Sequence, residues 1–525
     1  MDASQERLDA LFPAPAPAPK GSSVTPTRLV GPDADSVDAL VEVLQKNHKN
    51  LHIFFNDRHF HNHSTHHMLA IYALGAGPKL IKAAYASHEA YQRPAVSAPS
   101  PITKENWKEH LGDEAYYQSY LTFFSDLLLK DGPSAVFQQY VFSKDANFVP
   151  ANGKSERPNM YNRLLGGLVH PMIHAGYGAE FGQMGMWAEG LSEACVEQPQ
   201  PTALIPDSFF EELFASTPSI VSRLASIALS SSDKPRTQGK STHALSILGR
   251  VASDPQFSPA AIGLTPESGF GGLAQVVKAV GPVLHKFLEE WTVGSTQAEL
   301  DEKISELMWM NTVVYAVGGF GARKYASNQS KEFNSDFLLM HLVTSVLFVP
   351  SLASYLPHAT AAFFVRTYFI TSLALYIMRG RPALPVAEFF ATTTSKPAPR
   401  GPQPTPSTEV FTRGLDTPES KANWLAGGAH TITTPNPWLP LIQSTMVHPD
   451  EHLCKLQRAL MHFATLFGTV RKGAFARVAE GLEGAEELDG TLFVRAAGLT
   501  ANRLGWVREG EAHQQWDFSG FIHAV

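Results

Sequence analysis

Four histidines fall within seven residues and lead directly into an apolar segment. They are His61, His63, His66 and His67, and residues 68–74 that follow carry apolar side chains at helical spacing until a glycine ends the pattern. Because this helix runs into the core, some of the imidazoles must lie in a low-dielectric interior, where each needs a polar partner. A metal ion is the partner that suits several neutral imidazoles at once. The segment therefore indicates a metal site where a buried helix begins.

The composition indicates a large, mostly α-helical core. Apolar residues make up 44% of the 525 residues and charged residues 17%, and strand-like alternation is nearly absent. We expect a single large multi-helical domain with a buried active-site cavity, although this length could also hold two or three domains. The net charge of -7, without blocks of Lys and Arg, argues against nucleic acid and membrane surfaces as partners. Two cysteines, Cys195 and Cys454, suit a reducing compartment, so we expect a cytoplasmic protein.

Three regions differ in composition. Residues 1–26 are rich in Pro and Ala, lack the pattern of a signal peptide, and are expected to form a disordered tail. Residues 27–525 are expected to form the helical domain. Within it, residues 386–437 hold many Pro, Ser, Thr and Gly, which predicts an irregular surface excursion or lid.

Two apolar stretches, residues 337–356 and 359–378, are long enough to cross a membrane. Polar interruptions weaken that interpretation: His341 and Pro350 lie in the first stretch and Arg366 in the second. Buried helices that line a cavity explain these residues better, and we expect no membrane partner.

Histidines recur in apolar segments far from the first cluster. A helix that starts at Pro171 would place His170 and His174 near one face, and His341 lies inside an apolar stretch. For any one of them a hydrogen-bonded core histidine is the ordinary explanation, but several such groups would each need a separate buried partner. The pair at 170 and 174 lacks the glutamate of a zinc-protease helix, so that class of enzyme is not indicated.

His452 and Lys455 share one face of another predicted helix. A buried lysine tends to lose its proton, and a neutral amine can react with carbon dioxide to form a carbamate, whose oxygen could bind a metal. The alternative is a surface or salt-bridged lysine. A competing metal set is His448-x-Asp450, which has the His-x-carboxylate spacing of an iron facial triad, although Asp450 could equally cap the helix.

Arg379 and Arg381 end the second apolar stretch. Two guanidiniums there could bind a carboxylate or phenolate substrate, or they could simply complement the helix dipole. Cofactor fingerprints are poor: residues 269–274 match G-x-G-x-x-A, but no strand is expected before them. We therefore predict no cofactor-binding residues of the usual flavin or nicotinamide domains.

Four ordered motifs resemble those of the questin oxidase-like family. They are residues 60–76 with the histidine cluster, residues 170–181 (His-Pro-x-Ile-His-x-Gly-Tyr-Gly-x-Glu-Phe), residues 341–344 and residues 450–460. The resemblance implies an oxidoreductase of fungal secondary metabolism that cleaves a ring of an aromatic polyketide, such as an anthraquinone, in a Baeyer-Villiger-type oxidation. It also implies a non-haem metal site in place of flavin.

We combine these observations into one expected site. The expected ligands of a non-haem iron are His63, His170, His341, His452 and, as a carbamate, Lys455, with His67 and His174 as substitutes. The iron would use dioxygen on an aromatic polyketide, Arg379 or Arg381 would hold the oxyanion of that substrate, and NADPH is a further candidate cofactor. The alternatives are an NADPH- or flavin-dependent oxygenase without the usual fold, a metal-dependent hydrolase or lyase, and a non-catalytic helical scaffold.

Overall fold

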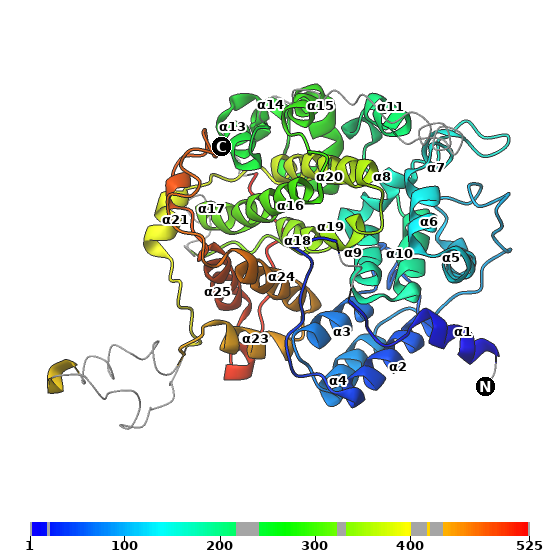
Figure 1. Cartoon of the computed structure of the whole chain (residues 1–525), viewed down its shortest axis with the longest axis horizontal. Coiled ribbons are helices and arrows are strands. Elements are labelled where there is room, and N and C mark those ends of the chain that lie inside the picture. The colour runs from blue at the N-terminus through cyan, green and yellow to red at the C-terminus, as the bar shows by residue number, and fades with distance from the viewer. Residues whose placement is uncertain are drawn as a thin grey trace, which may run out of the picture.

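Helices dominate the structure, which is a computed structural model. It describes residues 3–17, 21–216, 241–322, 332–400, 417–420 and 434–522. Within these ranges the β-type pairings are three isolated bridges, and helices from all parts of the chain pack around a shared core (Figure 1). The prediction of one large, mostly α-helical domain is confirmed.

The first four helices pack together at one end of the molecule (Figure 1). They are α1 (Ala3–Leu11), α2 (Ala34–Asn50), α3 (Ser64–Ala73) and α4 (Pro78–Glu89). α2 begins with a capping box, in which Asp33 and Ser36 each bond the backbone N–H of the other. All ten residues of α3 are buried, because α2, α4 and the later helix α24 (Glu451–Phe467) cover it. The apolar segment after the histidine cluster is therefore a core helix.

The expected disordered tail is wrong for residues 3–17. α1 packs against α10 (Met184–Val196), and Leu11 and Phe12 are each only 1% exposed. The Phe12 ring lies so close to Gly185 that a Cβ atom there would be 2.0 Å from the ring. Hydrogen bonds add to this packing, since Gln183 donates to the carbonyl of Pro13 at 2.6 Å and the Ala16 N–H donates to the carbonyl of Phe181 at 2.9 Å. Together they anchor a segment whose Pro and Ala content is typical of a free tail.

The next helices form a tightly packed group around α10. They are α5 (Tyr117–Asp131), α6 (Pro133–Phe137), α7 (Lys144–Phe148), α8 (Met160–Leu164) and α9 (Gly166–Phe181). α10 packs against both α5 and α9. A Cβ atom at Gly190 would lie 2.5 Å from the backbone nitrogen of Ala175. Glycine thus permits a close approach of two helix backbones.

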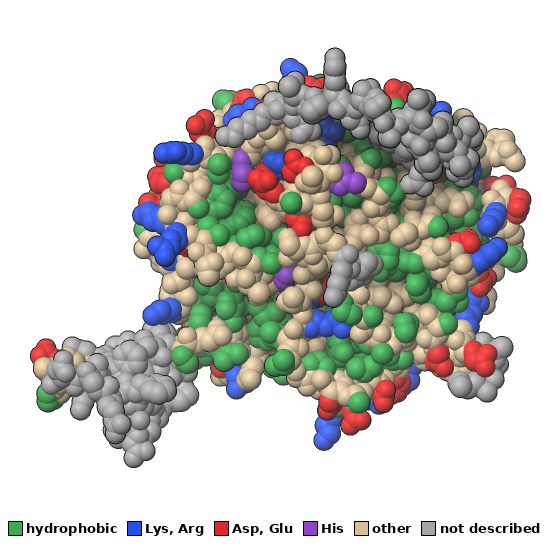
Figure 2. All heavy atoms as spheres, in the orientation of Figure 1, with side chains coloured by type: hydrophobic (Ala, Val, Ile, Leu, Met, Phe, Trp, Pro, Cys, Tyr) green, Lys and Arg blue, Asp and Glu red, His purple; other side chains and the backbone are tan. Residues whose placement is uncertain are grey.

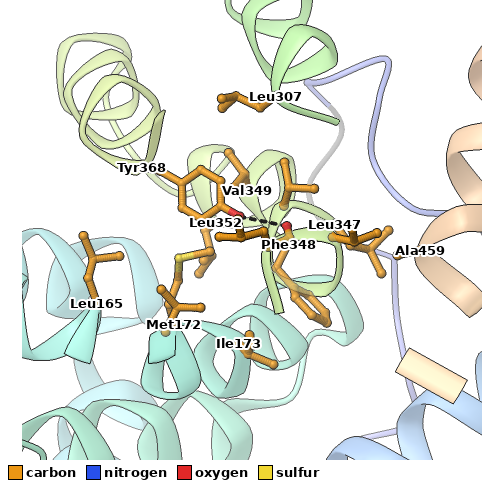
Figure 3. Packing of buried hydrophobic residues seen from close by; sticks show 14 of the residues in the cluster. Leu165, Met172, Ile173, Leu307, Leu347, Phe348, Val349, Leu352, Tyr368 and Ala459 are labelled. Carbon is orange, nitrogen blue, oxygen red and sulfur yellow. Dashed lines mark hydrogen bonds between the residues drawn. The ribbon is translucent and has the colours of Figure 1, made fainter. Parts of the chain in front are cut away.

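Long apolar helices form the centre of the molecule. The helices of the centre are α16 (Gln297–Thr312), α18 (Phe337–Val346), α19 (Val349–Ala353) and α20 (His358–Met378). Along the upper edge in Figure 1 lie α11 (Asp207–Ser216), α13 (Ala244–Ser253), α14 (Pro259–Ile262) and α15 (Gly272–Glu290), and the short α17 (Gly318–Ala322) comes between α16 and α18 in the sequence. Figure 3 shows Met172 and Ile173 of α9 beside Val349 and Leu352 of α19 in this core. Of the described helices, α20 alone is long and apolar enough to cross a membrane, but 89% of its most apolar stretch is buried in the protein.

One of the last helices, α24, packs against α3 of the N-terminal group. The last helices are α21 (Val386–Thr392), α23 (Trp438–Met446), α24 and α25 (Leu492–Leu504). Because Val386–Thr392 form a helix with a fully buried Phe389, the expected irregular excursion does not begin at residue 386. Much of its remainder, residues 401–416 and 421–433, lies outside the described residues.

Four helices from distant parts of the sequence contact one another in a ring. α24 contacts α3 and α18, and α9 also contacts both α3 and α18 (Figure 1). Each of these helices begins in or carries one of the four sequence motifs. On the outside, Figure 2 shows acidic and basic side chains interspersed over the face in view, so the side chains described there form no uniform basic patch.

Candidate metal centre

Four imidazoles converge at the ring of helices. One nitrogen each from His63, His170 and His452 lie within 4.8 Å of one another. The ring centroid of His341 is 4.8 Å from that of His170 and 5.4 Å from that of His452. All four side chains are buried. The structure therefore brings together the four histidines that were selected from the sequence.

The starts of the helices position these side chains. His63 is the N-cap residue of α3, and Asp450 caps α24 by accepting the backbone N–H of His452 at 2.8 Å. In α9, residues 167–169 have left-handed backbone angles, and the regular helix begins at His170. Two of these three residues are not glycine and cost about 1–2 kcal/mol each in this conformation. Strain of this kind is concentrated at functional sites.

One carboxylate lies beside two of the imidazoles. Glu451 Oε1 lies 3.1 Å from Nδ1 of His63 and 3.3 Å from Nδ1 of His452. A carboxylate at Nδ1 favours the tautomer with its proton on Nδ1, which leaves a lone pair on Nε2. Glu451 can therefore orient the His63 ring through this hydrogen bond, whereas its carboxylate faces His452 Nδ1 without hydrogen-bond geometry and acts on that ring by charge alone.

Backbone carbonyls hold the other two imidazoles. His341 Nδ1 donates to the carbonyl of Phe337 at 2.7 Å, and His170 Nδ1 donates to the carbonyl of Gly167. In all four histidines Nε2 is buried without a hydrogen-bond partner among the described residues. Buried polar atoms rarely lack a partner, and four such nitrogens close together are a set that one cation could satisfy.

Three of the four imidazoles are held in the neutral form, which is the form that binds metals. Burial, reinforced by the nearby Lys455 and by neighbouring histidines, lowers the pKa of His63, His170 and His341 well below the usual value, so these rings are neutral at pH 7. Burial also lowers the pKa of Lys455 to about 8, and its Nζ is buried without a hydrogen-bond partner. Neutral imidazoles beside an amine that can lose its proton suit a divalent transition metal.

Each of the two substitute ligands bonds another residue through one ring nitrogen, while Nε2 of His67 and Nδ1 of His174 are buried without a hydrogen-bond partner among the described residues. His67 Nδ1 lies 2.9 Å from Nε2 of His88. His174 Nε2 donates to Glu189 at 2.7 Å, and its Nδ1 lies 3.4 Å from Glu193. Burial opposes protonation of His174, but the two carboxylates outweigh it and raise the pKa to about 9. A protonated imidazole has no lone pair for a metal, so the structure does not support His174 as a ligand.

Two further histidines face the same region and were not selected. The His61 ring stacks on that of His170 with centroids 4.1 Å apart, and its Nε2 bonds Glu197 at 2.9 Å. Both ring nitrogens of His66 are buried without a hydrogen-bond partner, and its ring centroid is 5.4 Å from that of His63. Spacing in the sequence does not show that the His61 ring turns inward, because the chain is irregular before α3 starts. His66 lies inside α3, where the apolar pattern of the helix was the signal for its burial.

A cavity of about 820 Å³ adjoins the imidazoles. His61, His63, His170 and His452 line one side of it. Its aromatic wall consists of Phe55, Phe60, Phe337, Trp516 and Phe518, its aliphatic wall includes Leu273, Leu375 and Met378, and its polar residues include Arg58, Glu197, Gln198 and Gln200. A largely apolar cavity with a few polar groups is typical of small-molecule sites.

Arg379 and Arg381 do not line this cavity, so the prediction that they hold the substrate is wrong. Arg379 binds the carboxylate of Asp336 and donates to the carbonyl of Phe518 at 2.9 Å. Arg381 donates to the carbonyl of Val251 at 3.0 Å. Both guanidiniums bond other segments of the protein, because the turn after α20 directs them toward those segments.

The competing His448 and Asp450 triad is not assembled. His448 accepts the backbone N–H of Asp450 on Nδ1 at 3.1 Å and donates from Nε2 to the carbonyl of Leu504 at 3.3 Å. Neither nitrogen of His448 is left for a metal, and Asp450 is a helix cap. Residues 269–274 form a 3₁₀ turn and the start of α15, with no strand before them in the described region.

Comparison with known proteins finds relatives over most of the chain. A family model described as questin oxidase-like matches residues 60–460, which include all four helices of the ring. The Baeyer-Villiger oxidase GME11358 of Pestalotiopsis microspora is 29% identical over 332 residues, 62% of this chain and 66% of the relative. The oxidoreductase AflY of Aspergillus parasiticus is 27% identical over 324 residues, 60% of this chain and 57% of the relative. The questin oxidase of Aspergillus terreus is 31% identical over 163 residues, 30% and 34% of the two chains. The chain thus spans between about a third and two thirds of the length of these relatives.

Proposed function

Since the chain belongs to the questin oxidase-like family, we propose that it is an oxidoreductase that cleaves a ring of an aromatic polyketide, such as an anthraquinone, by a Baeyer-Villiger-type oxidation. The names of two relatives, a Baeyer-Villiger oxidase and a questin oxidase from fungi, support this reaction class. We place the enzyme in the cytoplasm and in secondary metabolism. Its two buried cysteines, Cys195 and Cys454, are unpaired, in keeping with a reducing compartment.

The proposed cofactor is a non-haem iron ion held by His63, His170, His341 and His452, with carbamylated Lys455 as a further ligand. One observation carries this proposal: all four imidazoles converge with Nε2 buried and unpartnered, while an oxygen faces each Nδ1. When bound, iron would supply activation of dioxygen and a Lewis acid for the substrate carbonyl. The protein supplies the positions of the ligands and a site that excludes water.

The cavity walls suit a flat aromatic substrate. Phe337 lies beside His452, with ring centroids 4.8 Å apart, and the Phe518 ring centroid is 4.7 Å from that of Phe337. Leu375 and Met378 of α20 add aliphatic surface. Stacking and apolar contact with these side chains would hold a planar ring system against the imidazoles.

The reaction needs a route for protons and a source of electrons. Insertion of one oxygen atom from dioxygen into a ring carbon–carbon bond gives a cyclic ester and leaves the second atom to become water, which consumes two electrons and two protons. Addition of one water molecule to this ester then breaks its C–O bond and opens the ring to a carboxylic acid and a hydroxyl group. NADPH is the proposed electron donor. His61 lines the cavity, and its Nε2 bonds Glu197 at 2.9 Å and lies 3.3 Å from Glu193, so it is placed to exchange a proton with a substrate hydroxyl group.

Incubation of the iron-loaded protein with an anthraquinone such as questin, NADPH and isotope-labelled dioxygen tests this proposal. We expect a ring-opened product that carries one labelled oxygen, with uptake of dioxygen and loss of activity in His170→Ala. The matched control is His285→Ala, because His285 bonds only backbone carbonyls of residues 203 and 204, outside the cavity.

Two results would replace the proposal with an alternative. Turnover without uptake of dioxygen would identify a metal-dependent hydrolase or lyase. A yellow purified protein with stoichiometric flavin, active without metal, would identify a flavin-dependent oxygenase.

A further inference from the structure

The segment that follows α25 forms part of the cavity wall. Residues 513–516 and Phe518 line the cavity, although they lie far beyond residue 460, where the match to the family model ends. No sequence motif pointed to this segment. Its contacts with the metal centre are therefore properties of this chain that the family match does not include.

Backbone and side-chain contacts hold the segment in place. The Asp517 backbone pairs with the segment before α18, since its N–H donates to the carbonyl of Ser335 at 3.0 Å and its carbonyl accepts the N–H of Phe337 at 2.9 Å. The Asp517 carboxylate accepts the Ser335 N–H at 2.8 Å and pairs with Arg503 at 2.7 Å. Arg379 donates to the carbonyl of Phe518. Before this pairing, the Gln514 N–H donates to the carbonyl of Leu504 at 2.8 Å. Residue 516 therefore lies between two anchored points and has a defined position.

That residue is Trp516, and its side chain points to the metal centre. Trp516 is only 4% exposed, and its indole N–H donates to Asp450 Oδ1 at 3.0 Å. The same oxygen accepts the backbone N–H of His452 at 2.8 Å and lies 3.4 Å from His452 Nδ1. A chain of contacts thus runs from the C-terminal segment through one carboxylate oxygen to a histidine of the centre.

We propose that Trp516 is a positioning residue, which holds Asp450 so that the His452 ring keeps the orientation needed to bind the metal. The proposal rests on the proposed function in one respect, that His452 is a metal ligand. Partners of a metal-binding imidazole fix its orientation and tautomer, and their loss weakens metal binding. Trp516 acts one contact further out, through the carboxylate that faces the ring.

Cobalt(II) bound to the full-length apo-protein is the probe, because its absorption spectrum reports ligand geometry and its titration gives affinity without substrate or turnover. Trp516→Phe keeps an aromatic ring and removes the N–H donor. We expect cobalt affinity to fall about 3- to 10-fold, less than the roughly 10- to 100-fold typical of a direct partner of a ligand, with a shifted absorption spectrum. The matched control is Trp506→Phe, because the indole N–H of Trp506 donates to Asn502 at 2.8 Å, outside the cavity.

A double-mutant cycle tests the route through the carboxylate. Asp450→Ser retains a residue that caps α24 well but is too short to reach the indole. We expect Trp516→Phe to have no further effect on cobalt affinity or spectrum in this background. Thermal unfolding of each apo-protein checks that a loss of cobalt is not a loss of fold.

The outcomes separate this inference from the proposed function. If wild type binds no cobalt, the metal site fails and this inference falls with it. Two results would overturn this inference while the proposed function stands. In the first, wild type binds cobalt and Trp516→Phe binds it equally well. In the second, Trp516→Phe lowers cobalt affinity by the same factor in the Asp450→Ser background as in wild type. Should Trp516→Phe not fold, unchanged cobalt affinity in Asp450→Ser alone overturns the inference.

Discussion

His63 and His452 come from opposite ends of the chain, yet their ring centroids lie 4.6 Å apart with the ring planes perpendicular. Glu451 lies beside both rings, with one carboxylate oxygen 3.1 Å from Nδ1 of His63 and 3.3 Å from Nδ1 of His452. The N-terminal and C-terminal motifs therefore meet through one acidic residue as well as through their imidazoles. This arrangement leaves both Nε2 atoms for a cation.

Glu451→Gln is expected to weaken metal binding about 10- to 100-fold, because an amide stabilises the Nδ1–H of His63 less than a carboxylate does and removes the negative charge that faces His452. Titration against a competing chelator measures the change. Glu42→Gln is the control, since Glu42 pairs with exposed lysines on α2 and α4. Equal metal affinity in Glu451→Gln and wild type would show that Glu451 does not orient the ligands.

Lys455→Ala is expected to lose metal and activity, and acetate or another short carboxylate is expected to restore part of both by replacing the carbamate oxygen. The reason is that burial lowers the pKa of Lys455 to about 8, so the amine that reacts with carbon dioxide is accessible near neutral pH. Lys303→Ala is the matched control, because Lys303 is also buried but pairs with Glu306 at 2.6 Å. Full metal content in Lys455→Ala without added carboxylate would rule out the carbamate ligand.

The stability of the apo-protein is expected to depend on pH through His174. Its carboxylate partners raise the folded-state pKa to about 9, above the usual 6.5. A raised pKa means that the protonated form is stabilised, so the contribution is complete below about pH 6.5 and is lost as the pH rises through about 9. Its size is on the order of 3 kcal/mol.

Chemical denaturation of wild type and His174→Gln at several pH values measures this contribution. The difference in unfolding free energy between the two proteins is expected to be largest in mild acid and to shrink as the pH rises toward 9. A difference that stays constant across this range would contradict a protonated His174 in the folded state.

Arg379→Ala is expected to lower the free energy of unfolding by about 3–5 kcal/mol, because it leaves the buried carboxylate of Asp336 without its partner. Asp336 also caps α18, which carries His341, so metal affinity is expected to fall as well. Arg471→Ala, which removes an exposed guanidinium, is the control. A variant with unchanged stability and a selectively raised KM would restore the view that Arg379 binds substrate.

The sequence was informative where a chemically distinctive residue lies in an apolar helix. His170, His341 and His452 are each embedded in such a pattern, so burial could be predicted for each, and burial of several imidazoles implies shared partners. The apolar pattern also predicted α20 correctly, but the other apolar stretch, residues 337–356, divides into α18 and α19. Convergence of the four rings follows because α3, α9, α18 and α24 contact one another.

The sequence was uninformative where a role depends on a distant partner. The sequence suggests that Arg379 binds substrate, but the structure shows that it pairs with Asp336. The sequence likewise suggests that His174 is a ligand, but the structure places Glu189 beside it. The contact of Trp516 with Asp450 depends on the path of the last described residues, which no periodicity encodes. Pairings of this kind are decided by tertiary packing, not by local pattern.

Metal analysis of freshly purified wild-type protein, with His170→Ala and His285→Ala beside it, tests the central claim most directly. A cation held by converged imidazoles predicts about one iron ion per chain in wild type and in His285→Ala, and almost none in His170→Ala with its helical content intact. Wild-type protein that turns over substrate without metal, or full metal occupancy in His170→Ala, would contradict it.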